Sequence, residues 1–280
     1  MQSMKEIEII QQFEDVFIEA GKLAVKLRND AVVEQKHNTG IKDIDIVTSS
    51  DLAVQEFVLQ KLVKSELKHC EIVAEEDTPS KNLFAKSSDH VITIDPIDGT
   101  NLYVSGKKMY SIIITIHNKK RPIYTFYYFP EVKWGMKIVY DRYQFFGNKP
   151  EIIHNTVLPK TVVYSFYNPI DCIPEQSAKL LKKGYVFRNK KEITDEAGST
   201  ALFLLEIVNG YFVENGSAVD CLVGLHYALA RGFEVYQNID LTKTVPSIIS
   251  GGNDEYRGNY LVIRNKQTID GWKLKTSVEK

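Results

Sequence analysis

The sequence VITIDPIDGT occupies residues 91–100 and carries an apolar run directly into two aspartates three positions apart. Asp-Pro and Asp-Gly are common turn pairs, so a surface turn that closes a strand is one interpretation. An almost wholly apolar strand is buried, however, and it delivers Asp95 to a desolvated edge where an unpaired carboxylate is costly. A bound cation would remove that cost.

The turn itself offers oxygen atoms of the kind that hard divalent cations prefer. Mg²⁺ takes oxygen ligands, and the carboxylates of Asp95 and Asp98 together with the backbone carbonyl of Ile97 could supply several at once. Three ligands leave the coordination shell of such an ion incomplete. Further acids from other parts of the chain are therefore expected at the site.

Two other acidic positions also fall where a predicted element begins or ends. Glu75 opens the triplet EED at 75–77 after a short apolar run, and Asp220 lies at the start of a helical segment. Taken alone, the triplet is typical of a solvated loop, and Asp220 of an acid near the positive end of a helix dipole. Separate segments often converge on one site from such positions, so both acids are expected to meet the Asp95 turn.

The composition describes a globular chain with a small ligand. Its 280 residues can bury a sizeable core, and 35 basic against 36 acidic residues argue against nucleic acid or an anionic membrane as the main partner. No run approaches the ~18 apolar residues of a membrane span, and the acids within the N-terminal apolar pattern are unlike a secretory signal. Three separated cysteines without CxxC spacing argue against a disulfide framework, so a reducing, cytoplasmic setting is expected.

The first 150 residues predict helices that pack on an antiparallel sheet. Apolar residues at steps of three and four predict one long helix over residues 10–27, and capping residues predict a second helix over 51–67. Short β-prone runs follow at 72–74 and 91–95. Four further runs with hairpin-like spacing are expected to be antiparallel: 110–117, 121–129, 133–139 and 143–146.

Residues 147–159 contain two prolines and no strong periodicity, so they are the predicted boundary between two halves, 1–150 and 151–280. Alternating elements in the second half predict α/β layering. The expected strands are 162–166, 185–188, 233–236 and 259–264, and the expected helices are 174–183, 197–208 and 219–230.

Five segments, in order and spacing, resemble the inositol monophosphatase family of Mg²⁺-dependent, lithium-sensitive phosphomonoesterases. The similarity extends from about residue 10 to about residue 265. It implies a layered α/β fold, an αβαβα sandwich with an antiparallel-rich N-terminal half and an α/β C-terminal half. The segments are DIVTSSD at 45–51, EED at 75–77, DPIDGTNLY at 95–103, AGSTA at 197–201 and VDCLVG at 219–224.

The resemblance also implies roles for individual residues around two or three Mg²⁺ ions. The implied metal ligands are Glu75, Asp95, Ile97 through its carbonyl, Asp98 and Asp220. The implied catalytic residues, which position and polarise the attacking water, are Glu75, Thr100 and Asp51. The implied substrate contacts are Asp98, Gly99, Thr100, Gly198, Ser199, Glu214 and Asp220.

Near Asp220 the chain departs from the family pattern. Val219 stands where the family usually has Trp, which puts the neighbouring wall of the substrate site in doubt. The stretch from residue 210 to residue 220 is shorter than in inositol-specific members. Glu214 therefore matches either their acceptor for a sugar hydroxyl or a solvated loop acid.

Four lysines are ambiguous. Lys107 and Lys108 follow the metal motif and could meet a second phosphate, although a solvated turn is the better interpretation. Either Lys36 or Lys42 could be the basic residue that precedes DIVTSSD in the family.

The expected function is hydrolysis of a small phosphate monoester by metal-activated water, without a covalent enzyme intermediate. An inositol or related polyol phosphate is the first expected substrate, and a bisphosphate nucleotide or sugar bisphosphate the second. A haloacid-dehalogenase-type phosphatase is the enzymatic rival, but its acids are two apart, whereas Asp95 and Asp98 are three apart. The rival from another class is a non-catalytic binding or regulatory homologue. Many relatives are homodimers, so a homodimer is possible.

Overall fold

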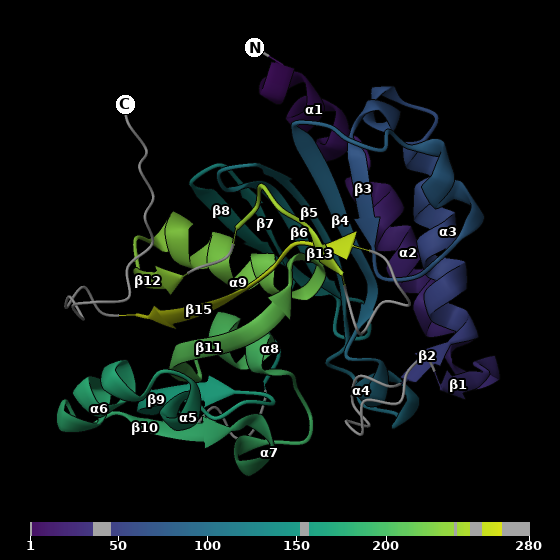
Figure 1. Ribbon diagram of the computed structural model, residues 1–280. Coiled ribbons are helices and arrows are strands. Elements are labelled where there is room, and N and C mark those ends of the chain that lie inside the picture. Colours follow the sequence, from purple (N-terminus) through teal and green to yellow (C-terminus); the bar gives the residue numbers. More distant parts are fainter. Residues whose placement is uncertain (1, 36–45, 152–156, 238–239, 247–253, 265–280) are drawn as a thin grey trace.

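Helices and sheets alternate in five layers in the computed structural model of the chain, which describes residues 2–35, 46–151, 157–237, 240–246 and 254–264 (Figure 1). Two sheets carry the architecture, one of six strands and one of five, with a helical layer between them and helices on both outer faces. The αβαβα sandwich expected from the sequence is thereby confirmed. Within the described residues, no helix is long and apolar enough to cross a lipid bilayer.

The six-stranded sheet lies wholly before residue 147. Its order is β3-β4-β5-β6-β7-β8; β3 and β4 are parallel and every other neighbouring pair is antiparallel, so the predicted antiparallel set is confirmed. The inner strands β4, β5 and β6 are nearly continuous apolar runs because both faces of the sheet are covered there. Their bounds are Glu71–Ala74, His90–Asp98, Ser111–Asn118, Pro122–Phe129, Trp134–Val139 and Arg142–Phe146.

Successive side chains on these strands face opposite layers. Ile112, Ile114 and Ile116 pack toward the N-terminal helices, whereas Ile113 packs toward the central helical layer. The same alternation on β4 places Val91 on the inner side. Asp95 is four positions after Val91 and so faces the same side of the sheet, toward the middle of the molecule.

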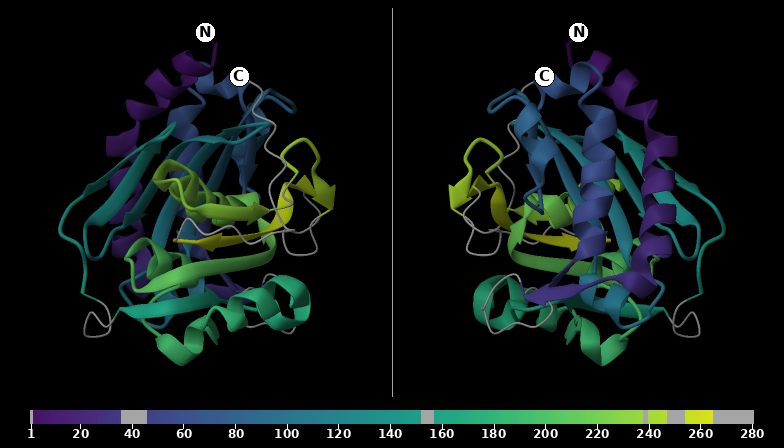
Figure 2. Two further views of the ribbon diagram at one scale, coloured as in Figure 1. Left: turned by 90° about the vertical axis from the view of Figure 1, so that its left-hand side faces the viewer. Right: turned by 90° about the vertical axis from the view of Figure 1, so that its right-hand side faces the viewer.

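Three helices cover the outer face of this sheet (Figure 2): α1 Gln2–Gln11, α2 Glu14–Leu27 and α3 Ser49–Leu62. The predicted single helix over residues 10–27 is wrong, because a tight turn at Gln12 and Phe13 separates α1 from α2. The N–H groups of Gln12 and Phe13 donate to carbonyls only three residues earlier, a tightening that is typical of helix ends. Two acids in the first turn of α2 then favour the start of a new helix. The second helix also ends earlier than predicted, at Leu62 instead of 67.

The five-stranded sheet is ordered β10-β9-β11-β15-β12 and is parallel on one side of β11 and antiparallel on the other. Its central strand was not predicted. The expected helix over 197–208 is confirmed only for α8, Ser199–Leu204, after which the chain enters β11. The bounds are β9 Leu158–Tyr164, β10 Val186–Asn189, β11 Val208–Ser217, β12 Glu234–Gln237 and β15 Arg257–Ile263.

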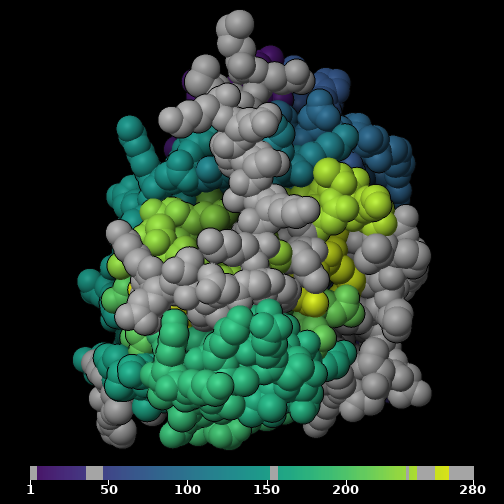
Figure 3. Space-filling model, turned by 60° about the vertical axis from the view of Figure 1, so that its left-hand side comes forward, coloured from purple at the N-terminus to yellow at the C-terminus, as the bar shows by residue number. Residues whose placement is uncertain are grey.

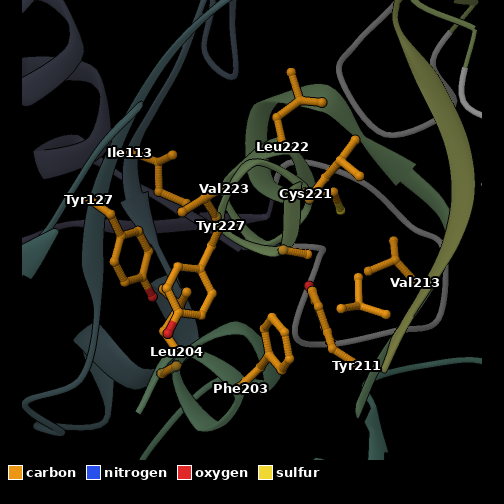
Figure 4. Close-up of a cluster of buried hydrophobic side chains, with 14 of the residues drawn as sticks. Ile113, Tyr127, Phe203, Leu204, Tyr211, Val213, Cys221, Leu222, Val223 and Tyr227 are labelled. Atoms are coloured by element: carbon orange, nitrogen blue, oxygen red, sulfur yellow. The ribbon is translucent and has the colours of Figure 1, made fainter. Parts of the chain in front are cut away.

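Helix α9, Ala218–Arg231, lies between the sheets and contacts β4, β5 and β6 on one side and β11, β12 and β15 on the other. Figure 4 shows its side chains Val223 and Tyr227 beside Ile113 and Tyr127 of the first sheet, with Tyr211 of the second sheet on their other side. The two sheets therefore share one hydrophobic core. Sheet membership changes between Phe146 and Leu158, and the division into two halves at this point stays a prediction.

Two helices cover the outer face of the second sheet: α5 Pro169–Cys172 and α6 Pro174–Lys182. Ile173 and Leu180 pack there against Val162, Phe212 and Leu261. In the space-filling view these helices and strand β10 form one continuous lobe at the bottom of the molecule (Figure 3).

Candidate active site

A cavity of about 220 Å³ brings together almost all of the residues expected at the site. It is bounded by the end of β4, the start of α4 (Thr100–Val104), the start of α8, strand β11 and the first turn of α9. Asp51 does not line the cavity but contacts Thr100, which does. The expected residues on its wall are Glu75, Asp95, Ile97, Asp98, Gly99, Thr100, Gly198, Ser199, Glu214 and Asp220.

The DPIDGT turn leaves the regular ladder of the first sheet. Pairing between β4 and β5 shifts between Asp95 and Asp98, as expected where a bulge redirects side chains. Asp95 Oδ1 accepts from the backbone N–H of Ile97 at 2.9 Å, and Ser111 Oγ donates to Asp98 Oδ2 at 2.7 Å. These bonds orient both carboxylates.

Gly99 ends the turn in a conformation that other residues rarely adopt. Its φ of 86° is left-handed, and it is the residue before the first turn of α4. The chain can reverse here and present its backbone at the cavity wall. Thr100 follows directly, with its side chain buried against the turn.

Glu75 reaches Asp95 because β3 and β4 are parallel and end at the same edge of the sheet. The N–H of Glu75 donates to the carbonyl of Ile94 at 3.1 Å, which continues the ladder by one residue. Burial raises the pKa of Asp95 well above its usual range. The negative charges of Glu75, Asp98 and Asp220 raise that pKa further, and Glu75 is within hydrogen-bonding reach of Asp95.

Asp51 connects helix α3 to the turn. Its Oδ2 accepts from the N–H of Thr48 at 2.8 Å and from the Thr48 hydroxyl, completing a capping box at the start of α3. Its Oδ1 accepts from Thr100 Oγ1 at 3.4 Å. Burial, together with the charge of Glu75, raises the pKa of Asp51 to about 7 although the Thr48 bonds oppose the shift.

The wall opposite the turn comes from the second sheet and α9. Asp220 is exposed in the first turn of α9, where Ser217 caps the N–H of Val219 at 3.2 Å. Val219, which replaces the family's Trp, is buried and lines the cavity. Glu214 lies on strand β11, lines the cavity and accepts a hydrogen bond from the Cys172 thiol. Its carboxylate is therefore held in place at the cavity wall, unlike that of a solvated loop acid.

Gly198 and Ser199 stand at the start of α8. Ser199 Oγ lies 2.6 Å from Ser165 Oγ, which also lines the cavity. Asn189 fixes the adjoining segment by donating to the carbonyl of Ser165 at 2.8 Å. The AGSTA segment thus supplies a small, polar part of the wall.

Several residues on the wall were not predicted. Lys190 begins helix α7 (Lys190–Ile193), and its charge opposes the rise that burial causes in the pKa of Asp98. Phe166 and Tyr167 line the cavity while 45% and 47% exposed, and Arg257 lines it from β15. In the sequence Lys190 belongs to the charged run KKE, typical of a solvated surface, so only the tertiary fold brings it to Asp98.

The ambiguous lysines lie away from the cavity or outside the described residues. Lys107 Nζ pairs with Asp195 at 3.1 Å and with Glu196 at 2.5 Å, and Lys108 is exposed. Neither lines the cavity, which agrees with the solvated-turn interpretation. Lys36 and Lys42 fall outside the described residues.

The donor set fits a hard divalent cation. Glu75, Asp95, Asp98 and Asp220 are four carboxylates that line one cavity, and the charges of the other three raise the pKa of Asp95. No three acids, histidines or cysteines in the described parts of the chain already stand as a closed metal-ligand group. Mg²⁺ does not require one, since it commonly binds through one or two carboxylates and keeps several waters.

A model of the inositol monophosphatase family matches residues 7–211. The chain belongs to the inositol monophosphatase family. Inositol monophosphatase 3 of Solanum lycopersicum is 28% identical over 113 residues, 40% of this chain and 42% of that protein. Inositol monophosphatase 2 of the same organism is 26% identical over 140 residues, 50% of this chain and 53% of that protein. The chain thus spans about half the length of the curated relatives it matches.

Solved structures of the family share the fold over nearly the whole chain. An IMPase from Thermotoga maritima has a TM-score of 0.61 at 19% identity and covers 92% of both chains. An IMPase/NADP phosphatase complexed with Mg²⁺ and phosphate has a TM-score of 0.60 at 15% identity, with 94% of this chain and 91% of that chain covered. At these identities the likeness shows the αβαβα fold.

Proposed function

We propose that the protein is a Mg²⁺-dependent phosphomonoesterase that uses a water molecule, and no enzyme nucleophile, to attack the phosphorus. The observation that carries this proposal is the convergence of Glu75, Asp95 and Asp98 with the Thr100–Asp51 pair at one end of one cavity. An acidic site alone would repel a phosphate ester. Cations held by these acids would reverse the local charge.

Two cation positions are supported by the donors. Glu75, Asp95 and the carbonyl of Ile97 would hold one ion, and Asp95 with Asp98 and Asp220 would hold a second. Divalent cations bound there would neutralise the phosphate, make the attacking water more acidic and stabilise the leaving oxygen. Asp95, as the shared ligand, is the most buried of the four acids.

Thr100 and Asp51 would orient the water and accept its proton. A hydroxyl can accept one hydrogen bond while donating another, so Thr100 Oγ1 can accept from water and donate to Asp51 Oδ1. A base works best when its pKa lies near the operating pH, and the pKa of Asp51 is about 7. Glu75, which follows strand β3, is close enough to Asp51 for its charge to raise the pKa of that carboxyl.

The phosphate would sit against the backbone at the start of α4. Gly99 lacks a Cβ, so phosphate oxygens can approach the N–H groups of Gly99 and Thr100 closely. Lys190 adds positive charge on the Asp98 side of the cavity.

The leaving group would lie toward β11 and α8. Glu214, Asp220 and Ser199 offer acceptors for hydroxyl groups, which suits an inositol or related polyol phosphate as the first substrate. The half-exposed Phe166 and Tyr167 support a second candidate, a bisphosphate nucleotide, because aromatic faces stack on bases. Lithium sensitivity, a homodimer and a cytoplasmic setting are proposed on the family's precedent.

The test is phosphate release by the purified full chain from a panel of inositol monophosphates, sugar bisphosphates and adenosine 3′,5′-bisphosphate, with and without Mg²⁺. We expect turnover that requires Mg²⁺ and falls with millimolar Li⁺. Rates ranked by kcat/KM would choose between the polyol and nucleotide candidates. If none of the panel members releases phosphate, the non-catalytic homologue is favoured. An aspartyl-phosphate trapped at Asp95 would instead favour the haloacid-dehalogenase-type phosphatase, which forms a covalent intermediate.

A further inference from the structure

Gln55 links the helix that carries Asp51 to the strand end that carries Glu75. Its side chain is 0% exposed. Its Nε2 donates to the carbonyl of Glu76 at 2.8 Å and to the Thr78 hydroxyl at 2.9 Å, and its Oε1 accepts from the N–H of Glu76 at 2.9 Å. One amide group thus bonds both backbone groups of Glu76, as a neighbouring β-strand would.

Lys81 holds the same segment through the two carbonyls that flank Glu75. Its Nζ donates to the carbonyl of Ala74 at 3.0 Å and to that of Glu76 at 3.2 Å. The N–H of Glu75 bonds the carbonyl of Ile94 on β4. The backbone around Glu75 is therefore fixed from three separate parts of the chain.

Asp51 and Gln55 are four residues apart on α3 and so lie on one face of that helix. Both are buried there. Asp51 contacts Thr100, while Gln55 contacts Glu76. Because the helix is rigid, it sets the position of the β3 end relative to the DPIDGT turn.

We propose that Gln55 is a positioning residue that fixes the Glu75 carboxylate relative to Asp51 and Thr100, with Lys81 assisting through the carbonyls on either side. This inference rests on the proposed role of Glu75 as a metal ligand. Groups that orient ligands without touching the ion change metal affinity or activity by roughly 10–100-fold when they are removed. A merely structural Gln55 would instead change stability alone.

Gln55→Met removes the three hydrogen bonds and keeps much of the side-chain volume. Gln60→Met is the matched control, because Gln60 is exposed on the same helix and donates to Glu56 at 3.0 Å. The probe is Mn²⁺ in place of Mg²⁺, titrated into the full chain without substrate and followed by electron paramagnetic resonance. Circular dichroism fixes a temperature at which every variant is folded. We expect the Mn²⁺ Kd to rise by roughly tenfold or more in Gln55→Met and to stay near wild type in Gln60→Met.

Lys81→Met is the second variant and carries the test if Gln55→Met does not fold. Its matched control is Lys86→Met, because the Lys86 side chain is exposed and donates to Asn82 at 3.2 Å. Loss of a positive charge near a cation site would strengthen Mn²⁺ binding by electrostatics alone. Positioning predicts the opposite sign, a severalfold weaker binding in Lys81→Met. Unchanged or tighter binding in that variant would overturn the assisting role of Lys81.

Glu75→Gln separates failure of this inference from failure of the proposed function. If Glu75→Gln loses Mn²⁺ affinity while Gln55→Met and Lys81→Met keep it, the positioning role is overturned and the proposed metal site stands. If Glu75→Gln itself binds Mn²⁺ as the wild type does, Glu75 is not a ligand, and both the metal assignment and the inference built on it are wrong.

Discussion

Thr100 Oγ1 lies 3.4 Å from Asp51 Oδ1 and 3.2 Å from the carbonyl oxygen of Ile97, although Asp51 is 49 positions away in the chain. One hydroxyl therefore stands between the helix layer and the turn that ends β4. Its single proton can satisfy only one of these acceptors at a time. A cation bound at the Ile97 carbonyl would repel the hydroxyl proton and favour its bond to Asp51, so Thr100 and Asp51 are coupled in the proposed chemistry.

Asp51→Asn is expected to lower kcat by roughly 10²–10⁴-fold, the usual contribution of a general acid–base group. The amide oxygen can still accept from Thr48, so the start of α3 should keep its capping interaction. Steady-state kinetics together with thermal unfolding would check this result. Asp77→Asn, a change at an exposed acid near the site, serves as the control and should behave as the wild type. Equal activity in Asp51→Asn and Asp77→Asn would remove Asp51 from the mechanism.

Asp95→Asn is expected to abolish most turnover and also to stabilise the metal-free protein. The amide oxygen preserves the bond from the N–H of Ile97, while the side chain at position 95 can no longer carry a negative charge within a buried cluster of acids. Active sites commonly sacrifice stability for function in this way. The check is the midpoint of thermal unfolding in EDTA near pH 8, which should rise above that of the wild type. A lower midpoint, or near-normal activity, would contradict the assignment.

Much of the site was predictable because its acids end strands. The sequence predicts from its apolar runs that Asp95 and Glu75 each end a strand. The structure adds the parallel pairing of β3 with β4, which brings the two acids together. The family resemblance added the proposed roles of Asp51, Thr100 and Asp220. The structure brings each of these residues to the cavity or to its supporting contacts.

The rest depended on tertiary structure. Strand β11 contains glycines at 210 and 216, and its pairing with β9 and β15 is long-range, so local patterns favoured extending helix α8. A Cβ at Gly210 would meet Val162 Cγ2 at 2.8 Å, which shows how closely the strand packs. Lys190 and Phe166 reach the cavity only after that sheet has formed, and Gln55 reads as an ordinary polar residue in its helix.

The stability of the metal-free protein is expected to fall as the pH rises from about 5 to about 8. The pKa of Asp51 is about 7 in the folded protein against an ordinary value of 3.8, so the folded state binds more protons across this range. A group of this kind stabilises the folded state fully below its unfolded pKa, and the contribution is lost as the pH rises through its folded pKa. The raised pKa values of Asp95 and Asp98 act in the same direction.

Mg²⁺ should reverse this dependence, because a ligand that binds only the folded state adds stability and the acids bind it when ionised. Thermal unfolding midpoints measured in EDTA and in saturating Mg²⁺ across the same pH range would check both statements. The difference between the two curves should widen toward high pH. A midpoint that rises with pH in EDTA would show that the buried acids do not carry the charge assigned to them.

Gly99→Ala is expected to cost about 1–2 kcal/mol of folding free energy and to lose most turnover as well. Gly99 has a φ of 86°, and a Cβ there would lie 3.2 Å from Leu102 Cδ1, so relief of the strain would move the backbone that is proposed to meet phosphate. Gly106→Ala is the matched control, since Gly106 has a φ of 77° with no atom within 4 Å of the added Cβ and lies off the cavity wall. Denaturant unfolding should report similar losses of stability for both variants, whereas only Gly99→Ala should lose kcat/KM. A parallel loss of activity in Gly106→Ala would mean that general destabilisation, and not the position of the Gly99 and Thr100 amides, limits the reaction.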